Sequence, residues 1–193
     1  NFGGWSLFQK TLERIKDKVF DAPIISTNVK YLVEIKKNLK KLKITKYKII
    51  LEPQKKNTAP AILTSALLNE VPINQPLVYF SSDHLIENFN IFKRAIKKNK
   101  KHLNSNNVIL FAIKPTNPNT EYGYLLLDKD KKGISKVKRF IEKPKLSKAR
   151  KIYKKKAYWN SGIFFIRKDS LIKNFKKYQS STFNNCNKAL IKS

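Results

Sequence analysis

Alternation of strand-like and helix-like segments is the sequence feature that most constrains how this chain can fold. Short apolar runs such as YKIILE at 47–52 are typical of buried strands. Between them, apolar side chains recur at steps of three and four residues, as over 59–69, which places them on one helix face. The spacing predicts helices over 6–17, 29–42, 59–69, 87–99, 147–154 and 168–178, and strands over 23–27, 47–52, 77–80, 107–113, 122–128, 134–142 and 158–166.

This order of elements predicts an α/β fold. Strand, helix and strand in succession give βαβ units, and hence a mixed, mostly parallel sheet with helices on both faces. After about residue 114 the pattern changes, because three strand segments follow with one short helix among them. We interpret that region as a mixed edge of the same sheet with an inserted substrate lobe. The residues after 178 are interpreted as a polar tail.

Length and composition bound the class of protein. The 193 residues suit one domain, or most of one, and no apolar run approaches the roughly 18 residues of a membrane span. Cys186 is the only cysteine, so no internal disulfide forms, and a cytoplasmic setting is the default expectation. The chain contains no methionine, so we expect it to be a fragment of a longer protein.

The charge is strongly basic, with 42 Lys and Arg against 13 Asp and Glu, a formal net charge of +29. A lysine-rich composition spread over solvated surfaces explains this most simply. Two alternatives stay open: a footprint for nucleic acid, and a site for phosphorylated substrates. Only five of the 42 are arginine, and the lysine runs 36–43 and 97–102 carry no aromatic residue. Nucleic-acid readers use both, so we expect no nucleic-acid partner.

Asp83 is the first candidate site residue. It directly follows the predicted strand 77–80 and two serines. In an open parallel sheet, ligands bind beyond the carboxyl ends of the strands. A carboxylate there can hold Mg²⁺, which prefers one or two carboxylates together with substrate phosphates. The alternative is a helix N-cap for the segment that follows. The adjacent His84 is interpreted as a structural residue and not as a base.

The segment LEPQKKNTAPA at 51–61 is the second candidate. Glu52 ends a strand, and a basic loop then runs to Asn57 and Thr58. Pro60 falls in the first turn of the next helix, where proline is tolerated. The helix would present free N–H groups at the carboxyl edge of the sheet, a geometry that suits a nucleotide. An ordinary capped helix is the alternative.

Three further stretches place polar groups at strand ends. Gly123 would let backbone approach a ligand closely, or would simply mark a bend in a strand. Glu142 and Lys143 can bind a sugar hydroxyl and a phosphate, with Lys143 held extended by Pro144; the alternative is a surface ion pair of little worth. Asn160 precedes a buried strand, where its amide can both donate and accept.

Taken in order, these motifs resemble a known family. The stretches SLFQKTLERI, ILEPQKKNTAPAI, SSDHLI, AIKPTNPNTEYGYL, RFIEKP and YWNSGIFFI occur in the order expected of the mannose-1-phosphate guanylyltransferases. The form resembled is the bacterial one, often fused to mannose-6-phosphate isomerase. The resemblance covers nearly the whole chain. It implies a Rossmann-like nucleotidyltransferase of the nucleotide-diphospho-sugar transferase type, which makes GDP-mannose and pyrophosphate from GTP and mannose 1-phosphate.

The resemblance also implies roles on the nucleotide side of the site. Asp83 is similar to the aspartate that holds Mg²⁺, the expected cofactor, beside the nucleotide α-phosphate. Asn57 and Thr58 stand in the segment that lies near the nucleoside, where Glu52 is also assigned to nucleotide binding. Asp83 and Lys143 are therefore the candidate catalytic residues.

On the sugar side, Gly123 and Glu142 resemble contacts to the hexose. Lys143 resembles the lysine that meets the phosphate of the sugar phosphate, and Asn160 the asparagine that binds mannose hydroxyls. We expect these residues and Asp83 to converge around one cleft.

The chain also departs from the family pattern. A glycine-rich loop ahead of the first helix and a second acidic metal ligand beyond WNSG are absent from the 193 residues. We therefore expect residues 1–193 to be an incomplete nucleotidyltransferase catalytic domain, nearly inactive in isolation. Part of the choice of base lies in that loop, so another hexose-1-phosphate nucleotidyltransferase using UTP or dTTP stays open, as does a non-catalytic basic module. Oligomer formation is possible.

Overall fold

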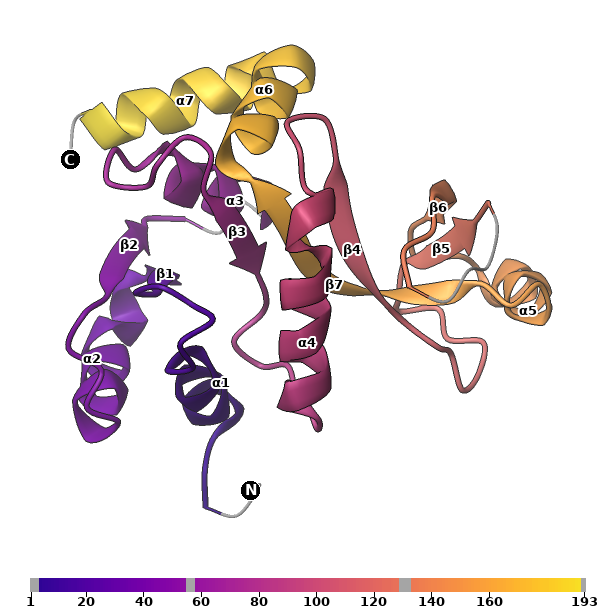
Figure 1. Ribbon diagram of the computed structural model, residues 1–193, viewed down its shortest axis with the longest axis horizontal. Coiled ribbons are helices and arrows are strands. Elements are labelled where there is room, and N and C mark those ends of the chain that lie inside the picture. Colours follow the sequence, from indigo (N-terminus) through magenta and orange to yellow (C-terminus); the bar gives the residue numbers. More distant parts are fainter. Residues whose placement is uncertain (1–3, 55–57, 129–132, 192–193) are drawn as a thin grey trace. The chain divides into compact units, whose positions relative to one another are not determined.

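The computed structural model describes residues 4–54, 58–128 and 133–191. It divides into two compact units: Asn1–Val108 with Ile166–Ser193, and Ile109–Phe165 (Figure 1). The helices are α1 Leu7–Ile15, η1 Val29–Tyr31, α2 Leu32–Lys41, α3 Thr58–Leu67, α4 Phe89–Asn99, η2 Lys100–His102, α5 Leu146–Lys154, α6 Lys168–Tyr178 and α7 Ser180–Ile191. The strands are β1 Ile24–Asn28, β2 Lys48–Glu52, β3 Pro76–Tyr79, β4 Val108–Ile113, β5 Tyr124–Leu127, β6 Val137–Ile141 and β7 Tyr158–Arg167.

The first unit is built on the parallel pair β1 and β2, in register from Ile24 opposite Lys48 to Asn28 opposite Glu52. Their apolar side chains pack with α1 and α2 in a core that contains Leu12 and Leu39, each 1% exposed. Helix α1 starts where the sequence predicts, because Ser6 caps it and the Gln9 side chain bonds back to the cap.

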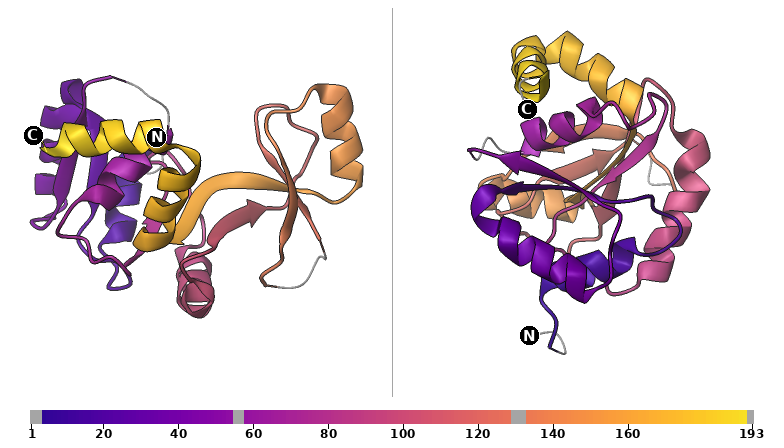
Figure 2. Two further views of the ribbon diagram at one scale, coloured as in Figure 1. Left: turned by 90° about the horizontal axis from the view of Figure 1, so that it is seen from above. Right: turned by 90° about the vertical axis from the view of Figure 1, so that its left-hand side faces the viewer.

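Helices α3, α6 and α7 lie on the other side of these strands from α1 and α2 (Figure 2). A second core joins Ala66 of α3 to Ile166 and Leu171, with Leu77 and Tyr79 of β3 packed against it. The two layers of helices on β1 and β2 confirm the predicted α/β class. The prediction of a polar tail after residue 178 is wrong, since α7 occupies Ser180–Ile191 and packs along α3 and α6.

In the second unit, β5 is the central strand and pairs antiparallel with both β6 and β7. Helix α5 covers one face through Ala149 and Ile152, which pack with the fully buried Tyr124. The described strands form two sheets. One contains only β1 and β2. The other has the strand order β3–β7–β5–β6, with β4 also paired to β7.

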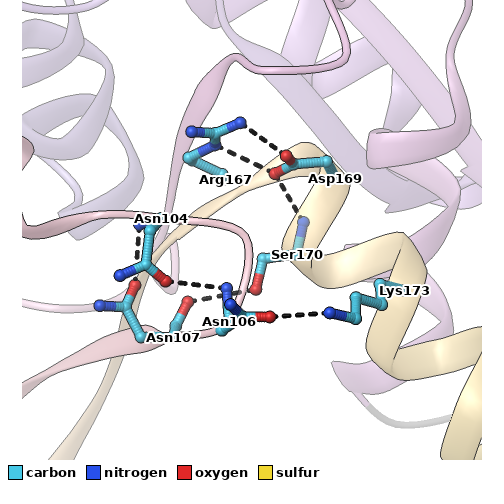
Figure 3. Close-up of polar contacts among 7 residues, drawn as sticks. All are labelled: Asn104, Asn106, Asn107, Arg167, Asp169, Ser170 and Lys173. Atoms are coloured by element: carbon cyan, nitrogen blue, oxygen red, sulfur yellow. Dashed lines mark hydrogen bonds and ion pairs between the residues drawn. The ribbon is translucent and has the colours of Figure 1, made fainter.

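A cluster of polar contacts in the first unit fixes the start of α6 (Figure 3). The Arg167 guanidinium donates to both Asp169 carboxylate oxygens, at 3.1 and 2.6 Å. Ser170 donates to the Asn107 carbonyl oxygen at 3.2 Å, and Lys173 to Asn106 Oδ1 at 2.7 Å. These groups satisfy one another, so the cluster is a structural junction between the loop before β4 and α6.

Within the described residues, no helix is both long enough and apolar enough to span a membrane.

Candidate active site

The turn that carries Asp83 is fastened to α1. Thr11, which is 6% exposed, donates its hydroxyl to the Ser82 carbonyl oxygen at 3.2 Å. Arg14 Nη2 donates to the His84 carbonyl oxygen at 2.8 Å. Arg14 Nη2 also donates to the Thr11 hydroxyl at 2.5 Å. The carbonyl groups on both sides of Asp83 are therefore held by two neighbouring side chains of one helix, and we call this arrangement the α1 clamp.

The Arg14 guanidinium is partly buried. Burial lowers the pKa of Arg14 from its ordinary value, and its Nε atom is buried with no hydrogen-bond partner in the described part of the chain. A charged donor in such a position forms stronger bonds to carbonyl oxygens than a solvated one. The α1 clamp is thus an arrangement that restrains the turn, and sequence analysis did not identify it. Its sequence signal is Thr11 and Arg14 at i and i+3 beside the apolar stripe of α1.

Asp83 is exposed, and across the described ranges its carboxylate forms no hydrogen bond or ion pair. The helix-cap alternative is wrong: α4 is capped by Asn88, whose side chain accepts from the Ile91 N–H at 3.2 Å. A free carboxylate beyond a strand fits Mg²⁺ in its usual binding mode, with substrate phosphates as further ligands. No cluster of three or more His, Cys, Asp or Glu able to hold a metal occurs among the described residues. Within the described ranges Asp83 thus presents a single carboxylate, and Mg²⁺ at this position stays a prediction.

The Glu52 carboxylate is already engaged within the β1–β2 pair. Its Oε1 accepts from the Ser26 hydroxyl at 2.5 Å, and its carbonyl oxygen accepts from the Asn28 amide at 3.0 Å. Thr58 is exposed at the first residue of α3, and Pro60 lies in the first turn as predicted. Asn57 lies outside the described residues. The assignment of Glu52, Asn57 and Thr58 to nucleotide binding stays a prediction.

Strand register brings three of the predicted sugar residues together in the second unit. Tyr124 of β5 lies opposite Ile141 on one side and Trp159 on the other. One residue beyond this row are Gly123, Glu142 and Asn160. The Asn160 N–H donates to the Gly123 carbonyl oxygen at 2.8 Å. These residues, separated by up to 37 positions in sequence, are thus neighbours at one end of the sheet.

Gly123 is buried, and other side chains fill the space where a Cβ atom would stand. A Cβ atom there would stand 2.9 Å from Glu142 Oε2 and 2.8 Å from Phe140 Cζ, so the missing side chain is what allows both groups to approach. In this structure, side chains of the same unit take the space beside Gly123. Close approach of a ligand to its backbone stays a prediction. Glu142 and Phe140 are both exposed, Phe140 by 46%.

Lys143 departs from expectation in its backbone. The sequence predicts an extended residue before Pro144, whereas its φ is +34°, in the left-handed region. That prediction is wrong, because the chain bends at Lys143 between β6 and α5, and Pro144 is buried there. A non-glycine residue in this region is strained, and such strain concentrates at functional sites. Its exposed side chain leaves the chain directly beside Glu142.

Asn160 is followed by a local irregularity in β7. Its Oδ1 accepts from the Gly162 N–H at 3.3 Å, and Gly162 has φ +73°. This turn-like bond orients the amide from within the strand. Asp83 belongs to the first unit and the sugar residues to the second, so their convergence stays a prediction.

Comparison with known proteins identifies the family. The model of the nucleotidyl transferase family matches residues 1–192. The chain belongs to the nucleotidyl transferase family. The predicted Rossmann-like nucleotidyltransferase fold is confirmed by the similar solved structures, and the predicted likeness to the mannose-1-phosphate guanylyltransferases by the relatives.

Individual relatives agree with this assignment. A mannose-1-phosphate guanylyltransferase of Escherichia coli is 32% identical over 190 residues, which cover 94% of this chain and 41% of that protein. The solved structure of mannose-6-phosphate isomerase from Helicobacter pylori is 32% identical, with a TM-score of 0.85 over 95% of this chain and 71% of that one. The chain spans about two fifths of the length of the curated relatives that it matches.

Proposed function

We propose that the protein transfers a guanylyl group from GTP to mannose 1-phosphate, giving GDP-mannose and pyrophosphate. The observation that carries the proposal is the cluster of Gly123, Glu142 and Asn160 beside Lys143. A carboxylate and an amide suit sugar hydroxyls, and an ammonium suits a phosphate. The choice of mannose and guanine is supported by relatives of about 30% identity that are named mannose-1-phosphate guanylyltransferase.

In this reaction a phosphate oxygen of the sugar phosphate attacks the α-phosphorus of the nucleotide, and pyrophosphate leaves from the opposite side. The protein forms no covalent bond, so it must bind and align two anions that repel each other. Glu142 and Asn160 would accept from and donate to the hexose hydroxyls and so fix the ring. Lys143 would pair with the attacking phosphate and reduce its repulsion from the nucleotide.

Asp83 would hold Mg²⁺, which when bound would neutralise developing negative charge on the nucleotide phosphates. The α1 clamp would keep the Asp83 carboxylate in one place, since its neighbouring carbonyl groups are fixed by Thr11 and Arg14. The basic surface of the chain would attract both anionic substrates.

The test is turnover by the full-length gene product with Mg²⁺, measured as pyrophosphate release over a panel of GTP, ATP, UTP and dTTP with mannose or glucose 1-phosphate. We expect GTP and mannose 1-phosphate to be the preferred pair. Asp83→Asn should lower kcat/KM by about 100-fold or more, whereas Glu87→Gln, an exposed acid further along the same loop, should leave it unchanged.

Preference for UTP or dTTP would replace the guanylyl assignment with another sugar nucleotidyl transfer. The absence of turnover with every pair, together with nucleic-acid binding that persists at about 150 mM salt, would replace it with the basic module.

A further inference from the structure

The two faces of the sheet in the second unit carry different side chains. Tyr124, Ile141 and Trp159 point to the face covered by α5, where they pack with Ala149 and Ile152. Because side chains alternate along a strand, Phe140 and Glu142 of the β6 segment point to the other face. The contacts around Gly123 agree, since a Cβ on that residue would meet both of these side chains.

Phe140 is an unusual residue for this position. It lies opposite Leu125, which is 1% exposed, yet 46% of Phe140 itself is exposed. The edge of its ring reaches over Gly123, with Cζ and Cε2 at 2.8 and 3.1 Å from where a Cβ would stand. An apolar ring therefore lies beside the Glu142 carboxylate and over Gly123, which carries no side chain.

This combination matches the chemistry of a hexose. A hexose ring has C–H groups on its faces and hydroxyl groups at its edge. It therefore suits an apolar surface flanked by a few polar groups that fix its orientation, the usual composition of a small-ligand site. Single exposed apolar residues are common on proteins and carry no meaning alone. At Phe140 the Glu142 carboxylate supplies the polar group, and the buried Gly123 lets the ring and the carboxylate lie together.

We infer that Phe140 is the apolar floor of the sugar site: it lies against one face of the hexose of the sugar phosphate while Glu142 binds its hydroxyl groups. The inference rests on the proposed function and adds a residue that contributes contact with the ring, and not with the phosphate. Phe140 thereby raises affinity for the hexose 1-phosphate without changing affinity for phosphate itself.

The experiment is calorimetric titration of the full-length protein with mannose 1-phosphate, and separately with inorganic phosphate. We expect Phe140→Ala to bind mannose 1-phosphate about tenfold more weakly, the effect of losing a partly buried apolar contact. Binding of phosphate should not change. Phe140→Tyr, which keeps the ring, should stay within about twofold of the wild type. The matched control is Val137→Ala, which truncates an exposed apolar residue on the same strand. This variant should bind mannose 1-phosphate as tightly as the wild type does.

The outcomes separate the inference from the function on which it rests. If Glu142→Gln weakens binding and Phe140→Ala does not, the inference fails while the proposed function stands. If the wild type binds neither mannose 1-phosphate nor glucose 1-phosphate, both fail. Should Phe140→Ala not fold, Phe140→Leu replaces it: weaker binding than Phe140→Tyr supports the inference, and equal binding overturns it.

Discussion

Replacing Gly123 by alanine should separate the stability of the second unit from its ability to bind a sugar phosphate. The new Cβ would stand 2.8 Å from Phe140 Cζ and 2.9 Å from Glu142 Oε2, closer than real contacts allow. Both atoms are the far ends of exposed side chains, which can rotate into solvent. Rotation of the two side chains therefore costs little folding free energy, but it displaces the two groups that we assign to the hexose.

The magnitudes follow from this geometry. Overpacking costs about 1–3 kcal/mol in a rigid core, but here the exposed side chains can yield, and alanine regains about 0.4–1 kcal/mol by restricting the unfolded chain. We expect the free energy of unfolding to change by less than about 1 kcal/mol, or roughly 2–4 °C in Tm for a chain of this size. Losing a hydrogen bond from a charged group costs about 1.5–3 kcal/mol. Affinity for mannose 1-phosphate should therefore fall at least tenfold.

The assay combines thermal unfolding followed by circular dichroism with calorimetric titration. Gly133→Ala is the matched control, because Gly133 has φ +113° with nothing within 4 Å of a new Cβ. It should show the opposite pattern, a loss of about 1–2 kcal/mol from backbone strain with affinity intact. A large loss of stability in Gly123→Ala would show that the two side chains cannot move aside, and unchanged affinity would show that they do not bind the hexose.

Three further predictions concern the first unit. Thr11→Val should remove the bond to the Ser82 carbonyl oxygen, lower the free energy of unfolding by about 1–3 kcal/mol and speed hydrogen exchange in the Asp83 turn. Lys168→Met should cost about 2–4 kcal/mol in chemical denaturation, because two carbonyl oxygens that accept from its buried ammonium at 2.8 and 2.7 Å lose their donor. Burial raises the pKa of Tyr79 to about 12. Its contribution to stability, at most about 3 kcal/mol, is complete below about pH 10 and is lost as the pH rises through about 12; Tyr79→Phe should flatten that alkaline loss.

Each of these has a distinct contrary result. Unchanged exchange in the turn of Thr11→Val would mean that the α1 clamp does not restrain it. Lys168→Met as stable as the wild type would mean that water satisfies the two carbonyl oxygens. Titration of every tyrosine near pH 10, followed by absorbance at 295 nm, would contradict burial of the Tyr79 hydroxyl.

The elements with strong periodicity could be predicted from the sequence, because their apolar faces meet the cores directly. Leu12 and Leu39 are examples, and both are fully buried. Helix α7 could not, since its Ser- and Asn-rich segment has weak helix propensity and gains its helical form by packing on α3 and α6. Propensity alone gives no account of such tertiary contacts.

Among the candidate site residues, Gly123, Glu142 and Asn160 lie together because strand register aligns them. Their roles stay predictions. The left-handed backbone of Lys143 was not predictable, because a following proline favours an extended residue, whereas the chain bends at Lys143 ahead of α5. The sequence did not single out Phe140, because Phe140 and Ile141 are adjacent apolar residues and alternation alone does not say which of them faces the core.

We propose that the end of the second unit's sheet binds the sugar phosphate. Titration of isotope-labelled protein with mannose 1-phosphate, followed by two-dimensional amide NMR, tests it most directly. We expect the largest amide shifts to fall on Gly123, Glu142, Lys143 and Asn160, and we expect Glu142→Gln to weaken them. Shifts confined to other parts of the chain, with these four amides unmoved, would contradict it.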